Sequence, residues 1–106
     1  MSFREAQDTV DRWISQYEEG YFAPLANVAR LAEEVGELAR EVNHHFGPKT
    51  RKPDEPVGSI PLELADLLFV VICLANSQKI DLDDAFGQMM AKVTVRDAGR
   101  WTKKAR

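Results

Sequence analysis

Two pairs of acidic residues are spaced so that each pair would share one face of a helix. The first pair is Glu34 and Glu37, directly preceded by Glu33, and the second is Glu63 and Asp66. At about 100° per residue, side chains three positions apart lie within about 60° of each other on a helix. Two carboxylates about 5 Å apart repel by roughly 3 kcal/mol even at an effective dielectric constant of 20. If the two helices pack together, their carboxylates need a cation between them.

The ligand types favour a hard cation. Carboxylate oxygens suit Mg²⁺ or Mn²⁺, whereas structural zinc sites use cysteine and histidine. A di-iron carboxylate bundle needs Glu-x-x-His on two helices, and this chain has Glu-x-x-Glu and Glu-x-x-Asp instead. Because Mg²⁺ held by carboxylates usually completes its coordination with substrate phosphates, a phosphorylated ligand is expected.

The end of the chain carries a positive charge that suits such a ligand. The last fifteen residues hold six Lys or Arg residues and a single acidic residue, although the net charge of the whole chain is −3. Lys92, Arg96 and Arg100 recur every four residues and could face one phosphate chain. Trp101 and Trp13 could stack on a base, although aromatic residues at helical spacing more often pack in a core. An acidic domain of this kind is not expected to bind nucleic acid.

Each acidic pair also has a simpler interpretation. Glu-x-x-Glu is common on solvated helix faces, and the first turn of any helix favours acidic residues through its dipole. The joint spacing of the two pairs, rather than either pair alone, supports a metal site. His44 and His45 lie at the end of the predicted second helix. A positively charged side chain there interacts favourably with the helix dipole, which is a simpler role for these residues than metal binding.

Helical periodicity runs through almost the whole chain, and no segment alternates like a strand. Four segments are predicted to be helices: residues 3–17, 24–45, 61–78 and 82–93. Gly20 suits the end of the first helix and Asp81 the start of the last. Between the second and third helices, residues 47–59 are rich in proline and predict a flexible connector. The expected fold is all-α, a four-helix bundle in one domain over residues 1–106, with a basic tail at 97–106.

Composition narrows the class of protein. A chain of 106 residues with 44% hydrophobic and 29% charged residues predicts one soluble globular domain. The single cysteine, Cys73, excludes a disulfide scaffold, and the N-terminus lacks the apolar core of a signal peptide. The uncharged apolar run at 67–75 is too short to span a membrane. The third helix is apolar on nearly all sides and predicts burial in a bundle or an oligomer interface. We therefore expect a cytoplasmic homo-oligomer with no membrane partner.

Longer stretches of the sequence resemble a known family. ARLAEEVGELAREVNHHFG and ELADLLFVVICLANSQKIDLDDA are similar to the two motif helices of the single-domain MazG-like nucleotide pyrophosphohydrolases, a group of all-α NTP pyrophosphatases. RDAGRW resembles their C-terminal element. The resemblance covers about residues 12–102. In a chain that is similar over this length, the two acidic pairs are a specific sign of the family.

The resemblance implies an activity and a set of roles. Members hydrolyse nucleoside triphosphates, often deoxy or damaged ones, to the monophosphate and pyrophosphate with Mg²⁺, which Mn²⁺ can replace. They assemble as dimers or dimers of dimers whose helices line the site together. Carried over to this chain, Glu34, Glu37, Glu63 and Asp66 would be the Mg²⁺ ligands. Glu33 would act beside them in catalysis, holding a metal-bound water or a further ion.

Two alternatives stay open. A phosphoribosyl-ATP pyrophosphohydrolase shares the general chemistry and the helical architecture. A non-catalytic helical module for oligomerisation or nucleotide sensing would keep the acidic face without turnover. The complete set of carboxylates argues against the second alternative, because a purely structural bundle gains more from apolar residues at such positions.

Overall fold

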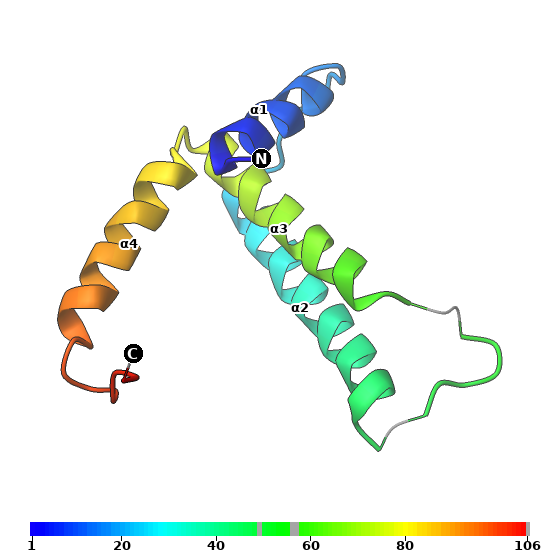
Figure 1. The fold of residues 1–106 in the computed structure, drawn as a ribbon. Helices are drawn as coiled ribbons and strands as arrows, with labels where there is room; N and C mark the ends of the chain where they lie inside the picture. Colours follow the sequence, from blue (N-terminus) through cyan, green and yellow to red (C-terminus); the bar gives the residue numbers. More distant parts are fainter. Residues whose placement is uncertain (49, 56–57, 106) are drawn as a thin grey trace.

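The computed structural model describes residues 1–48, 50–55 and 58–105, and every regular element among them is a helix (Figure 1). The helices are α1 (Phe3–Ile14), α2 (Pro24–Phe46), α3 (Ile60–Ser77) and α4 (Leu82–Arg96). The predicted all-α fold with four helices is therefore confirmed for these residues. Positions 49, 56 and 57 of the predicted connector and residue 106 of the basic tail lie outside the described residues.

Local sequence signals explain where the helices begin. Ser2 and Glu5 form a reciprocal capping box at the start of α1. The Ser59 hydroxyl accepts a hydrogen bond from the first turn of α3, and Asp81 accepts two from the first turn of α4. The predicted start of the last helix is therefore confirmed.

The first helix is shorter than predicted and ends at Ile14 rather than at residue 17. The backbone N–H groups of Gln16 and Tyr17 donate to carbonyls three residues back, which forms a turn instead of a continued α-helix. Gly20 then adopts a φ of +60°, which glycine reaches without steric cost, and the chain reverses toward α2.

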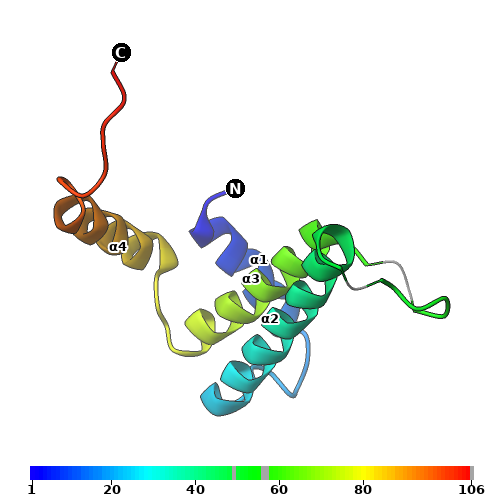
Figure 2. The same cartoon turned by 90° about the horizontal axis from the view of Figure 1, so that it is seen from below.

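Helices α2 and α3 lie side by side as an antiparallel hairpin, and α1 crosses one end of it (Figures 1 and 2). The buried side chain of Gln7 fixes α1 to this hairpin, since its amide nitrogen donates to Asn76 of α3 and to the Ile80 carbonyl at 2.9 and 2.7 Å. Among the residues that the structure describes, the buried apolar ones all belong to α3: Val70, Ile72, Cys73 and Ala75.

Helix α4 extends away from the α2–α3 hairpin and touches α1 near the start of both helices (Figures 1 and 2). The rings of Phe3 and Phe86 lie 5.2 Å apart, and the Asp83 carboxylate accepts from the backbone N–H groups of Phe3 and Arg4 at 3.2 Å. No residue of α4 is buried. The four-residue link 78–81 directs α4 outward, so the expected four-helix bundle is not closed within one chain.

Helix α2 turns its polar face toward α3 and its apolar stripe outward. The stripe residues Leu25, Val28, Val35 and Val42 are 40–84% exposed.

By length and composition α3 could cross a bilayer, with a mean hydropathy of 1.8. The core helix of a globular protein meets the same criteria, and α3 supplies the core here.

We expect a stable dimer or larger assembly of this chain in solution. Leu68, Phe86 and Met89 are 41–50% exposed and line an apolar cavity of about 320 Å³ between α3 and α4. Apolar surface of this extent on several helices usually marks an interface. Light scattering at micromolar concentration measures the mass directly. A mass near 12.0 kDa would contradict this prediction.

Candidate metal centre

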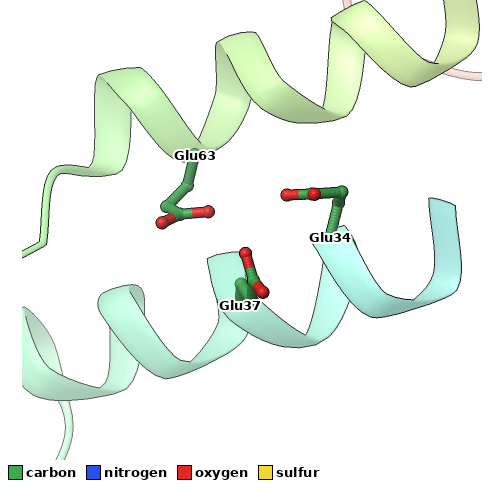
Figure 3. A group of neighbouring side chains, drawn as sticks. All are labelled: Glu34, Glu37 and Glu63. Atoms are coloured by element: carbon green, nitrogen blue, oxygen red, sulfur yellow. The ribbon is translucent and has the colours of Figure 1, made fainter. Parts of the chain in front are cut away.

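Three of the predicted carboxylates converge between the two antiparallel helices. Figure 3 shows Glu34 and Glu37 pointing from α2 toward Glu63, which points back from α3. One carboxylate oxygen from each residue can be chosen so that all three lie within 4.8 Å of one another. The arrangement follows from the one-turn spacing on α2 and from the antiparallel pairing, which brings the first turn of α3 beside the second half of α2.

The electrostatics of this cluster favour a bound cation. Burial first, and then the carboxylates of Glu37 and Asp66, raise the pKa of Glu34 above its ordinary value. The same causes in the same order raise the pKa of Glu63. The Oε2 atoms of Glu34 and Glu63 are both buried, and neither has a hydrogen-bond partner among the described residues. Unpartnered buried carboxylate oxygens are costly, and an all-oxygen donor set fits Mg²⁺ or Mn²⁺.

Two other acidic candidates are exposed and lie outside this group of three. Asp66 is exposed one turn beyond Glu63, and its charge contributes to the raised pKa of both Glu34 and Glu63. It does not belong to the group of three converging carboxylates. Glu33 is exposed beside Glu34 on α2. Their roles as fourth ligand and catalytic residue therefore stay predictions.

The predicted substrate-binding residues lie elsewhere in the chain. Lys92 and Arg96 are exposed on α4, and Arg100 and Trp101 follow it. The Arg96 and Arg100 guanidinium groups lie 3.1 and 3.7 Å from the Asp97 carboxylate, and Arg100 also stacks on Trp101 at 4.9 Å. Because α4 diverges from α2 and α3, this chain does not bring these residues to the carboxylates (Figure 1). Their role in binding phosphate needs a second copy of the chain and stays a prediction.

A second polar cluster was not expected from the sequence. Glu41 is only 6% exposed, and its carboxylate lies 3.9 Å from His44, 3.9 Å from His45 and 3.8 Å from Arg51. Glu41 faces Nδ1 of His44, and Nε2 of the same ring lies 3.6 Å from the Glu55 carboxylate. The three- and four-residue spacing from Glu41 to the histidines was a local signal for this cluster. Arg51 and Glu55 belong to the connector, whose path the helical pattern does not give.

An all-α fold with three carboxylates that converge between two antiparallel helices is compatible with a metal-dependent phosphohydrolase. A family model for the MazG nucleotide pyrophosphohydrolase domain matches residues 22–101, so the chain belongs to the MazG family of nucleotide pyrophosphohydrolases.

Known relatives agree with this assignment. The Bacillus subtilis (strain 168) protein YpjD is 52% identical over 103 residues, which cover 97% of this chain and 93% of YpjD. The crystal structure of B. subtilis YpjD, described as a proposed pyrophosphatase, has a TM-score of 0.78 and 51% identity over 87% of this chain and 94% of that one. A Bacillus-conserved MazG protein, described as a nucleotide pyrophosphohydrolase, has a TM-score of 0.75 and 50% identity over 87% and 88% of the two chains.

We expect Mg²⁺ and Mn²⁺ to raise the melting temperature. A cation present at about ten times its Kd adds about 1.4 kcal/mol of stability, which corresponds to about 6–11 °C for a domain of this size. Calorimetry with millimolar MgCl₂, with and without nucleotide, measures the shift. Indifference to both ions would argue against the site.

The size of this shift should depend on pH. The folded state binds protons at Glu34 and Glu63 more tightly than the unfolded state, because burial and the neighbouring carboxylates raise both folded pKa values above that of an ordinary glutamate, about 4.3. Their contribution to stability is therefore present below that pH and is lost as the pH rises through the raised pKa values. A cation reverses this loss, so the rise in Tm should be larger at pH 8 than at pH 5.

Proposed function

We propose that this protein hydrolyses nucleoside triphosphates, either NTPs or dNTPs and including non-standard or damaged ones, to the monophosphate and pyrophosphate. The observation that carries the proposal is the convergence of Glu34, Glu37 and Glu63 between α2 and α3 in a chain of the MazG family. Such an enzyme would remove unwanted nucleotides, a house-cleaning role in the cytoplasm.

In the proposed mechanism, Glu34, Glu37, Glu63 and Asp66 hold Mg²⁺. The bound ion would neutralise charge on the phosphates and lower the pKa of water. Glu34 and Glu37 from α2 and Glu63 from α3 would hold the ion, and Glu33, next to Glu34 on α2, would orient the attacking water. Attack at the α-phosphorus displaces pyrophosphate as the leaving group.

The phosphate chain also needs cationic contacts. We assign them to Lys92, Arg96 and Arg100, with Trp101 beside them, from a second copy in a homodimer or homotetramer. The basic charge of this segment complements a triphosphate. Since α4 has no buried residue in its own chain, it is free to lie against another copy.

Release of pyrophosphate from a panel of all NTPs and dNTPs with Mg²⁺ tests this function, and phosphoribosyl-ATP on the same panel tests the related activity. In ¹⁸O water we expect the label in the nucleoside monophosphate, because water attacks the α-phosphorus. Label in orthophosphate, released with no pyrophosphatase present, would contradict this chemistry.

A further inference from the structure

Arg51 of the connector brings a positive charge back to the face of α2 that carries the carboxylates. Its guanidinium lies 3.8 Å from the Glu41 carboxylate. Glu37 and Glu41 are four residues apart and therefore share one face of α2, about 6 Å apart along the axis. Burial and the neighbouring carboxylates, Glu41 among them, raise the pKa of Glu63. The Arg51–Glu41 pair is therefore the next group beyond the metal centre on the connector side.

Arg51 has hydrogen-bonding capacity that the protein does not use. A guanidinium carries five N–H donors in a planar fork. One terminal nitrogen faces Glu41, at a distance longer than a hydrogen bond, and the Nε atom is buried without a partner among the described residues. The side chain is 27% exposed, so a ligand can reach part of it from solvent. Unused donors on a partly exposed guanidinium suit an anion that accepts two hydrogen bonds, and phosphate has this geometry.

The opposite end of the same face suits an anion less well. One turn before Glu34 the face continues to Arg30, whose guanidinium already covers the Phe22 ring at 5.4 Å. Phe22 and Phe69 line the cavity beside it, and aromatic walls do not compensate the charge of a phosphate. Phosphates that extend beyond the metal centre therefore find a partly unused cation on the connector side.

We propose that Arg51 binds the pyrophosphate part of the substrate, the β- and γ-phosphates, in the same chain whose carboxylates hold the metal. The inference rests on the proposed function for the position of the ion. One helical turn separates Glu37 from Glu41, which is comparable to the length of two linked phosphates. Glu41 acts as a positioning residue, because its carboxylate holds the guanidinium at this end of α2. The positive charge also stabilises the negative charge that develops on pyrophosphate as it leaves the α-phosphorus.

Pyrophosphate with Mg²⁺ tests this contact by isothermal titration calorimetry, because it is the product of the proposed reaction and carries no base. Arg51→Gln should raise the Kd for pyrophosphate about tenfold or more, since charge-assisted hydrogen bonds are the strong ones. Arg51→Lys keeps the charge but not the fork, and should recover part of the loss. Arg12→Gln is the matched control, because Arg12 is exposed on α1, and should leave the Kd unchanged. If the wild type does not bind millimolar pyrophosphate, or if Arg51→Gln binds it equally well, the inference is wrong.

A titration with Mn²⁺ alone separates a phosphate contact from a loosened connector. Arg51→Gln should bind Mn²⁺ at least as tightly as the wild type, because the substitution removes a positive charge near the carboxylates. Weaker binding of both Mn²⁺ and pyrophosphate would mean that Arg51 supports the fold of the site, and would overturn the contact.

The contact and the proposed function can fail separately. Pyrophosphate binding that depends on Arg51, without release of pyrophosphate from any NTP or dNTP, would refute the hydrolase. Release of pyrophosphate with a KM that Arg51→Gln leaves unchanged would refute the contact.

Discussion

Glu37→Gln and Asp66→Asn should each lower kcat/KM by about a hundredfold or more, while the metal-free protein keeps or gains stability. A bound ion contributes several kcal/mol to stabilising the transition state, and a hundredfold loss corresponds to about 2.7 kcal/mol. Each substitution also removes one like charge from beside Glu34 and Glu63, whose pKa values are raised in part by these neighbours. Steady-state kinetics at saturating Mg²⁺ and calorimetry without metal measure the two effects.

Three interpretations of the carboxylates give different pairs of results. Surface acids would change neither activity nor stability, and a structural network would lose both together. Glu19→Gln is the matched control, because Glu19 is an exposed acid in the turn after α1. Its kcat/KM should stay within about threefold of the wild type, in line with a surface substitution. Full Mg²⁺-dependent turnover by Asp66→Asn would remove this residue from the proposed ligand set.

Local patterns predicted the helices and most of the carboxylate cluster. The apolar spacing and the Asp81 cap are properties of a few consecutive residues, so the start of α4 follows from the sequence. Ser59, which caps α3 one residue before the predicted start, was not predicted as a cap. The convergence of Glu34, Glu37 and Glu63 needs only helical spacing and an antiparallel pairing of adjacent helices. Both conditions hold because the chain reverses between α2 and α3.

The remaining features depend on contacts between distant segments. The direction of α4 is set by its short link and by Phe3 and Asp83, which helical periodicity cannot indicate. The apolar stripe of α2 does not identify the face that packs on α3. The face toward α3 holds the carboxylates, and the apolar stripe points outward. Glu41 lies one turn beyond Glu37 on α2, and its burial depends on Arg51 and Glu55 of the connector.

Glu41→Gln should destabilise the protein by about 2 kcal/mol and lower Tm by about 8–16 °C. The change leaves Arg51 and the two histidines without the carboxylate that they surround. Removing one partner of a fully buried ion pair costs about 3–5 kcal/mol, and the value here is smaller because the Arg51 side chain is 27% exposed. Calorimetry gives the change in Tm, and Glu19→Gln, which removes an exposed carboxylate, should leave Tm within about 2 °C.

The same substitution should release the connector from the end of α2. Arg51 and Glu55 hold residues 50–55 against Glu41 and His44, so trypsin should cut after Arg51 about ten times faster in the variant, since local opening limits such cleavage. Cleavage after the exposed Lys103 provides an internal control within the same digest. Gly58→Ala should act in the same direction, because a Cβ at this position would overlap the end of the Glu41 side chain, so that either this carboxylate or the connector must shift. If Tm and the cleavage rate after Arg51 are unchanged in both variants, Glu41 does not anchor the connector.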